Sequence, residues 1–184
     1  APFVRPFEPL FRAGRFDPLN ASEWDRIGVG ALNSPAHQRV AAEAAAQGLV
    51  LLKNDGTLPL APTRRNVAVL GPSGVTRGGL MSDYAGNDRN MQTCFNGTDY
   101  DCMQSIAEAV AAVNGAERTG RARGVDVNST NASGIAGALE RGARADVIIL
   151  VLGIDKTIEA EGHDRADTAL PGLQPAFASA VLGL

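Results

Sequence analysis

The run DVIILVLG, residues 146–153, predicts the strongest strand of this chain. It is short, apolar and rich in β-branched residues, which is typical of a strand. The run RNVAVLG, residues 65–71, predicts a second buried strand that ends in a Gly-Pro-Ser-Gly turn. A third, weaker strand is expected within GAERTGRARGV, residues 115–125.

Helical patterns alternate with these strands. Ser34 and Pro35 predict a helix start before the Ala-rich residues 36–47. Further helices are expected in residues 101–115, 131–145 and 170–184. Alternating strands and helices predict an α/β fold, with a parallel sheet covered by helices. Ligands of such sheets bind beyond the carboxyl ends of the strands.

The N-terminal third has a different character. Residues 1–33 lack sustained periodicity, apart from a short helical pattern in residues 10–16, and resemble a linker that lies on another surface. Residues 48–60 predict the end of the preceding helix, a turn at Asn54–Gly56 and an extended Leu-Pro-Leu.

Composition excludes several classes of protein. A net charge of −3 and scattered arginines argue against nucleic acid as a partner. No apolar stretch approaches the roughly 20 residues that span a bilayer. GPSG at residues 71–74 lacks the Lys-Ser/Thr of a P-loop and the spacing of a dinucleotide site, which argues against nucleotide binding.

Two signals bear on the compartment. Cys94 and Cys102 suggest a local disulfide, with two free thiols as the alternative, and neither lies at the spacing of a metal site. The acceptor pattern for N-glycosylation occurs at Asn20, Asn96, Asn128 and Asn131. Together they favour a secreted or luminal glycoprotein.

Ionisable residues crowd the stretch TIEAEGHDR, residues 157–165, directly after the strongest strand. This position is where an open α/β sheet presents its site. The alternative is a solvated cap over the last helix, with weak surface ion pairs among Glu159, Glu161, Asp164 and Arg165.

Several motifs together resemble one family. LLKNDGTLPL (51–60), VAVLGPSG (67–74), LMSDYAG (80–86) and the stretch from Ala145 to Gln174 are similar in order and spacing to the C-terminal domain of family 3 glycoside hydrolases, β-xylosidase branch. The resemblance covers residues 8–184, because FRAGRFDP also resembles the segment that leaves the family's first domain. It implies a three-layer α/β sandwich with a mainly parallel sheet, of which only the first strands are present. Residues 1–33 would then be a linker from a missing N-terminal barrel, and residues 34–184 a partial C-terminal domain.

The resemblance also implies a mechanism. Family members are retaining exo-β-glycosidases, with an aspartate nucleophile on the barrel and a glutamate acid/base on the second domain. It assigns Glu161 as the acid/base, with Glu159 as the alternative. Asp164 and Arg165 would support the loop by an internal ion pair, and His163 receives no role. No cofactor or metal is implied.

Three function classes therefore stay open. The first is part of a β-xylosidase or β-glucosidase, whose partners are a β-linked saccharide and the polypeptide that supplies the barrel and remaining strands. The second is a non-catalytic interaction module whose open sheet edge a host complex covers. The third, an independent small-molecule binder, has little support, because half a sheet makes a poor pocket.

Overall fold

The computed structural model describes residues 4–18, 21–60, 65–81, 100–101 and 103–184. The chain forms two units, residues 1–61 and residues 62–184, and each is described by itself. The predictions for four residues lie outside the described part of the chain: Cys94, Cys102, Asn20 and Asn96.

The first unit begins with a helix that the sequence only partly indicated. Helix α1 spans Val4–Arg12, earlier than the predicted residues 10–16. Its apolar side packs on the turn that follows, where the ring of Phe16 lies 4.4 Å from that of Phe11 and 6.2 Å from that of Phe7, between centroids. These aromatic contacts explain why residues without a clear period are helical.

The remainder of the first unit contains three helices. Two short 3-10 helices, Glu23–Arg26 and Val29–Ala31, precede α2, Pro35–Gly48. As predicted, α2 starts after Ser34, whose Oγ accepts a hydrogen bond from the backbone of His37 at 3.3 Å. None of the described side chains from Arg5 to Leu60 is buried within the unit.

The predicted turn at Asn54 is present. The Oδ1 atom of Asn54 accepts from the backbone N–H groups of Gly56 at 3.2 Å and Leu58 at 3.0 Å, and its Nδ2 donates to Leu58 O at 2.7 Å. Helix α2 ends at Gly48, the first of the predicted residues 48–60, and Leu49 that follows it is extended.

The second unit is built on a parallel sheet. Its strands are β1 (Val67–Leu70), β2 (Thr119–Ala122) and β3 (Val147–Leu150), in the order β2-β1-β3. Both neighbours pair with β1 in parallel. The predicted α/β fold is confirmed, and the central strand is the one whose four residues are all buried.

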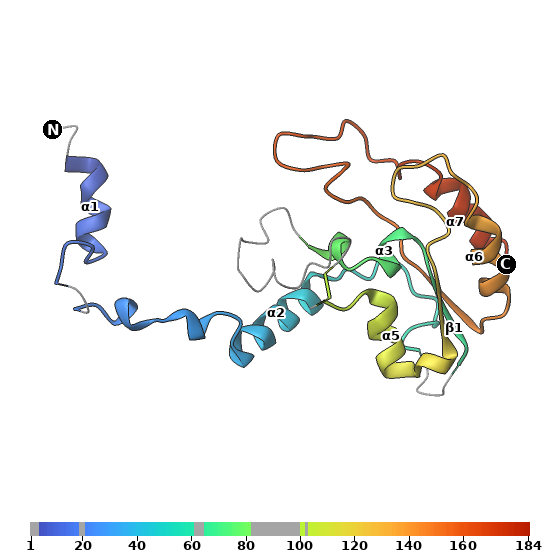
Figure 1. Cartoon of the computed structure of the whole chain (residues 1–184), viewed down its shortest axis with the longest axis horizontal. Helices are drawn as coiled ribbons and strands as arrows, with labels where there is room; N and C mark the ends of the chain where they lie inside the picture. The colour runs from blue at the N-terminus through green and yellow to red at the C-terminus, as the bar shows by residue number, and fades with distance from the viewer. Residues whose placement is uncertain (1–3, 19–20, 61–64, 82–99, 102) are drawn as a thin grey trace. The chain divides into compact units, whose positions relative to one another are not determined.

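Alternate residues of β1 face opposite layers. Ala68 and Leu70 pack toward helices α6 (Ile135–Ala143) and α7 (Gln174–Leu182), whereas Val67 and Val69 pack toward α5 (Ile106–Asn114) and the single-turn α3 (Pro72–Val75). Figure 1 shows α6 and α7 on one side of β1 and α3 and α5 on the other. The arrangement has three layers, with helices on both faces of the sheet.

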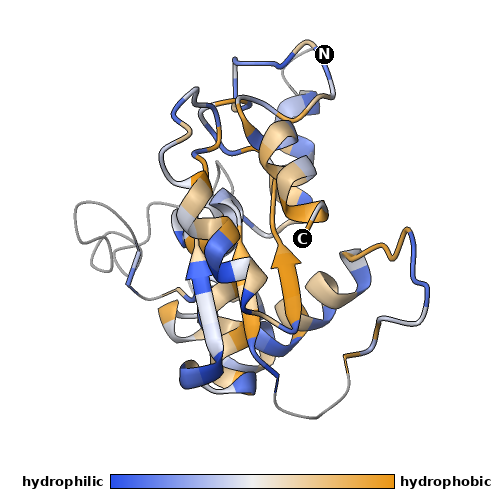
Figure 2. Cartoon of the chain, turned by 90° about the vertical axis from the view of Figure 1, so that its right-hand side faces the viewer, coloured by the Kyte–Doolittle hydropathy of each residue, from blue (hydrophilic) through white to orange (hydrophobic). Residues whose placement is uncertain are grey.

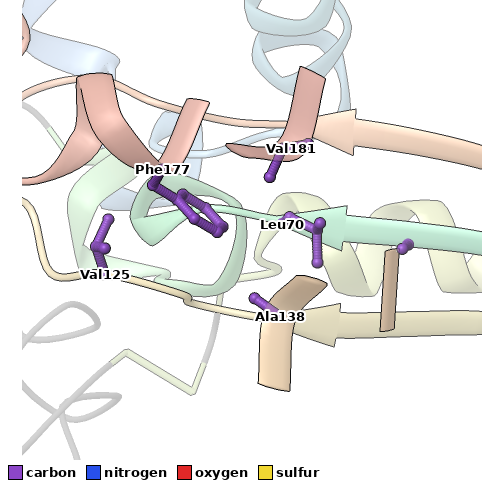
Figure 3. Packing of buried hydrophobic residues seen from close by; sticks show 6 residues of the cluster. Leu70, Val125, Ala138, Phe177 and Val181 are labelled. Atoms are coloured by element: carbon purple, nitrogen blue, oxygen red, sulfur yellow. The ribbon is translucent and has the colours of Figure 1, made fainter. Parts of the chain in front are cut away.

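The core on the α6–α7 face is centred on an aromatic ring. Phe177 is fully buried, and Figure 3 shows it gathered with Leu70, Val125, Ala138 and Val181. The backbone of Gly124 lies against this ring: its φ is +73°, and a Cβ there would come within 2.3 Å of the ring. Only glycine combines this backbone conformation with that contact.

Helix α5 starts later than the sequence pattern indicated. Ser105 caps it in a capping box, since its Oγ accepts from Glu108 N at 3.2 Å while Glu108 Oε2 accepts from Ser105 N at 2.8 Å. This reciprocal pair satisfies two backbone donors at the helix start and fixes the first helical residue at Ile106.

The two outer strands of the described sheet differ in polarity. Figure 2 shows β3 as an apolar arrow, while β2 is paler and bluer. The sequences agree, since β3 reads VIIL and β2 reads TGRA. Within the described residues, no helix combines the length and the apolar character that crossing a bilayer requires.

Candidate catalytic loop beyond the third strand

Three segments leave the sheet at the same end, beyond the carboxyl ends of the strands, because the strands are parallel and in register. They are residues 71–81 after β1, residues 123–134 after β2 and residues 151–173 after β3. The last of them carries the ionisable residues of TIEAEGHDR. The sequence therefore predicted correctly that this loop emerges at the carboxyl ends of the strands.

The base of this loop is tied together by one side chain. Gln174 is fully buried at the start of α7. Its Nε2 donates to the carbonyl oxygens of Gly153 and Val127, both at 2.8 Å, and its Oε1 accepts from Gly153 N at 2.9 Å. The amide thus joins Gly153, the third residue beyond β3, to the segment that follows β2.

The returning end of the loop lies against the same segment. Leu173 N donates to Ser129 O at 3.1 Å. Gly172, with φ +58°, packs so closely that a Cβ would meet Ser129 N at 2.6 Å. Glycine is required here for both its conformation and its lack of a side chain.

The tip of the loop is a tight turn that presents Glu161. Ala160 and His163 exchange two backbone hydrogen bonds, of 3.0 and 2.9 Å. Glu161 is the second residue of this turn, and Gly162 is the third with φ +74°, a conformation that glycine adopts readily. Both Glu161 and the alternative Glu159 are exposed in the described structure.

The ion pair of this loop differs from the predicted one. Arg165 Nη2 pairs with Asp167 Oδ1 at 2.8 Å and also donates to Ala169 O, whereas Asp164 is exposed and is not its partner. Asp167 is favoured because its carboxylate also accepts from Ala169 N, so one turn orients both groups. The Arg165 hydrogen bond, aided by that backbone donor, lowers the pKa of Asp167.

A cavity of about 450 Å³ lies beside the loop. It combines a histidine, an arginine, two aspartates and an asparagine with several apolar groups. Its lining residues are Asn128, Thr157, Ile158, His163, Asp164, Arg165, Asp167, Ala169, Leu170 and Pro171. Ligand pockets in general combine apolar side chains with a few polar groups.

A second polar cluster, near the segment after β1, was not predicted. Arg77 donates two hydrogen bonds to Glu108, at 3.0 and 2.6 Å, and a third to Asp101 at 2.8 Å. Arg121 of β2 reaches Glu108 at 3.5 Å. The Arg77 guanidinium, with the Ser105 backbone N–H, lowers the pKa of Glu108 to about 2. The spacing Ser105-x-x-Glu108 was a readable signal for the cap, but the Arg77 contact spans 31 residues.

The remaining predicted site residues have simpler surroundings. Asn128 and Asn131 are exposed, and Asn131 Oδ1 accepts from Ser133 N at 3.0 Å. Among the residues that the structure describes, no group of histidine, cysteine and carboxylate side chains is arranged to hold a metal ion.

Residues 49–183 match the C-terminal domain of glycosyl hydrolase family 3. The chain belongs to this family. The family's domain thus begins at the extended residues that follow α2 and includes the whole parallel sheet, the catalytic-loop candidate and α7.

Relatives of this family 3 chain include fungal proteins. It is 33% identical over 171 residues to the probable exo-1,4-beta-xylosidase bxlB of Aspergillus flavus, covering 93% of this chain and 20% of the relative. The probable exo-1,4-beta-xylosidase xlnD of Aspergillus terreus is 34% identical, with the same coverage. The chain therefore spans about a fifth of the length of these relatives.

Two solved structures extend the comparison. A family 3 exo-beta-xylosidase, XlnD, in complex with a xylobiose aziridine activity-based probe superimposes with a TM-score of 0.75 and 31% identity, covering 97% of this chain and 21% of that one. A family 3 beta-glucosidase from Bifidobacterium adolescentis gives a TM-score of 0.61 and 27% identity, covering 86% and 22%.

Proposed function

We propose that this chain is part of a retaining exo-β-glycosidase of the β-xylosidase type, in which Glu161 is the acid/base. The observation that carries the proposal is the turn from Ala160 to His163, which presents Glu161 at the tip of a loop whose base is fixed to the sheet. The likeness to exo-xylosidases over 93% of the chain supports the choice of reaction and substrate class.

The chemistry needs two carboxyl groups about 5 to 5.5 Å apart. Glu161 would first donate a proton to the departing sugar oxygen, and as a carboxylate it would then activate the water that hydrolyses the glycosyl-enzyme intermediate. The nucleophile would come from a barrel domain outside this chain. A carboxylate at the exposed tip of an anchored loop is suited to meeting a partner on another domain.

The first unit supports this domain arrangement. Its 3-10 helices carry large apolar side chains that the unit itself does not bury, among them Trp24, 68% exposed, and Val29, 86% exposed. Exposed apolar surface of this kind marks a region that packs against another surface. We assign residues 1–33 as the linker from the barrel domain, which would cover these side chains.

The same proposal includes export of the protein. Asn128 and Asn131 are exposed acceptors for N-glycosylation, which would accompany passage through a secretory pathway. A disulfide between Cys94 and Cys102 would fit that compartment. Peptide mapping of the native protein before and after enzymatic removal of N-linked glycans tests the glycosylation sites. Mapping before and after reduction tests the disulfide.

The test of Glu161 uses the complete polypeptide that carries these residues. Glu161→Ala is expected to lower kcat for xylobiose by about 10² to 10⁴-fold, because protonation of the leaving group is lost. Azide should restore part of the turnover of an activated aryl β-xyloside, since it replaces the water that Glu161 would activate. Retention of configuration in the product checks the two-step course.

Glu159→Ala is the matched control, because Glu159 lies on the same loop and is equally exposed. It should keep near-normal kcat and show no azide effect. The opposite pattern would move the acid/base to Glu159. Normal activity in both variants would refute the catalytic assignment and favour the alternative hypothesis, a non-catalytic interaction module.

A further inference from the structure

Gln174 makes three hydrogen bonds at the base of the loop that carries Glu161. Their choice of partners goes beyond what burial of the side chain requires. A buried amide satisfies its polar atoms with any nearby partners, yet here two of the three hydrogen bonds go to one residue, Gly153. Both the N–H and the C=O of Gly153 are engaged, which fixes the orientation of its peptide planes. The chain toward Glu161 leaves the sheet from this residue.

The third hydrogen bond, to Val127 O, ties this exit to the neighbouring segment. That segment also receives the returning end of the loop, through Ser129 and Leu173. Gln174 is buried at the centre of a partly buried network that joins the departure of the loop, its return and the chain after β2. A change at this amide alters the direction in which the loop leaves the sheet.

Glutamine suits this position chemically. The network needs one acceptor, for Gly153 N, and two donors, for the carbonyls of Gly153 and Val127. A primary amide provides this combination at the length of the glutamine side chain. Methionine fills a similar volume without donors, and an ionised carboxylate would oppose both carbonyl oxygens.

We propose that Gln174 is a positioning residue for the acid/base step: through Gly153 and Val127 it sets the direction of the loop that carries Glu161. This inference rests on the proposed function. Gln174 touches no substrate, and its effect reaches the reaction only through the placement of the loop. Placement errors of about 1 Å can cost 10²-fold in rate.

The test measures how strongly the rate depends on the leaving group. Dinitrophenolate departs without a proton, whereas the sugar leaving group of xylobiose needs one. In the complete polypeptide, Gln174→Met is expected to lower kcat/KM for xylobiose by about 10 to 100-fold and to lower kcat/KM for a dinitrophenyl β-xyloside, which also reports the first, glycosylation step, by less than about 3-fold. The ratio between the two substrates is the readout.

Val181→Ala is the matched control. Val181 is buried on the same helix but makes no hydrogen bond to the loop base, so its truncation destabilises α7 without redirecting the loop. Both substrates should then change by the same factor. An equal loss on both substrates in Gln174→Met, or no loss on either, would overturn the proposal.

Gln174→Glu provides a second route if Gln174→Met does not fold. When protonated, the new side chain can accept from Gly153 N and donate to one carbonyl, so the substrate ratio should be near that of the parent at low pH. Ionisation places a negative charge against two carbonyl oxygens, and the ratio should shift as the pH rises. A ratio that follows the parent enzyme's at every pH would refute the positioning role.

Glu161→Gln, measured on the same two substrates, separates the two hypotheses. If that variant does not discriminate between the leaving groups, the proposed function itself fails. If it does discriminate while the Gln174 variants do not, only the positioning role fails.

Discussion

On the α6–α7 face of the sheet, Leu70 meets a fully buried phenylalanine, Phe177, within a wholly apolar cluster. On the α3–α5 face, Val69 meets a smaller cluster, and the ion pair between Arg77 and Glu108 lies nearby. Apolar packing is insensitive to pH, whereas a partly exposed ion pair depends on pH and salt. The loop that carries Glu161 is joined, through Gln174 of α7, to the apolar face.

Among the substitutions that test this comparison, Phe177→Ala should cause the largest loss of stability. Removing a fully buried ring costs about 3 to 5 kcal/mol in the free energy of unfolding, and the loss should not vary between pH 4 and 8. Hydrogen exchange of the β1 amides measures it. Phe177→Leu should cost less, and an equal loss in the two variants would contradict the cavity explanation.

Gly124→Ala should have the next largest effect, a loss of about 2 to 4 kcal/mol in the free energy of unfolding. The loss arises because alanine would be strained at this positive φ and its Cβ would press on the Phe177 ring. The cause can be separated in a double-mutant cycle with Phe177→Leu, because the smaller side chain relieves the contact but not the backbone strain. The two substitutions should therefore be less than additive. Strict additivity would mean that the φ angle alone is responsible.

Glu108→Gln tests the α3–α5 face. We expect it to lower the free energy of unfolding by about 1 kcal/mol at neutral pH, because the amide keeps the cap of α5 but loses the ion pair with Arg77. The pKa of Glu108 is lowered to about 2 from an ordinary value of 4.5. The ion pair therefore contributes fully above about pH 4.5 and loses its contribution as the pH falls toward 2. The difference in stability between parent and variant should shrink over that window, and a constant difference would contradict the assignment.

Arg121→Ala should have the smallest effect, below about 0.5 kcal/mol, since its side chain is 58% exposed and lies 3.5 Å from Glu108. Thermal unfolding at low and high salt checks it. A larger loss, or one that high salt does not reduce, would show that Arg121 does more than pair with Glu108 at the surface.

Local signals in the sequence predicted the frame of the second unit. The apolar runs at residues 67–70 and 147–150 predicted strands of a parallel sheet, because length, β-branching and flanking glycines all lie within a few residues. The first was predicted to be buried and is, whereas β3 is partly buried. The position of TIEAEGHDR directly after the strongest strand predicted the end of the sheet at which the loop emerges. Each of these features depends on neighbours in sequence.

Features that depend on distant partners were not predicted. The motif Leu-Pro-Gly-x-Gln was visible, but nothing local indicates that Gln174 bonds to Val127, 47 residues away. The resemblance implied Asp164 as the partner of Arg165, whereas the backbone donor at Ala169 orients Asp167, which is the partner that the structure shows. Helix α1 begins earlier than the predicted residues 10–16, and its apolar contacts involve Phe16, beyond its own end.

The pairing of β1 with β3 also constrains how the protein is made. Asn66 and Asp146, at the start of the two strands, are 80 residues apart, so at about 5 to 20 residues per second a ribosome needs about 4 to 16 s to deliver the second after the first. During that interval the Val-Ala-Val-Leu segment has emerged without its later neighbour. A nascent chain of this kind is a natural client for chaperones, and synonymous codons that slow translation between the two strands should lower its yield.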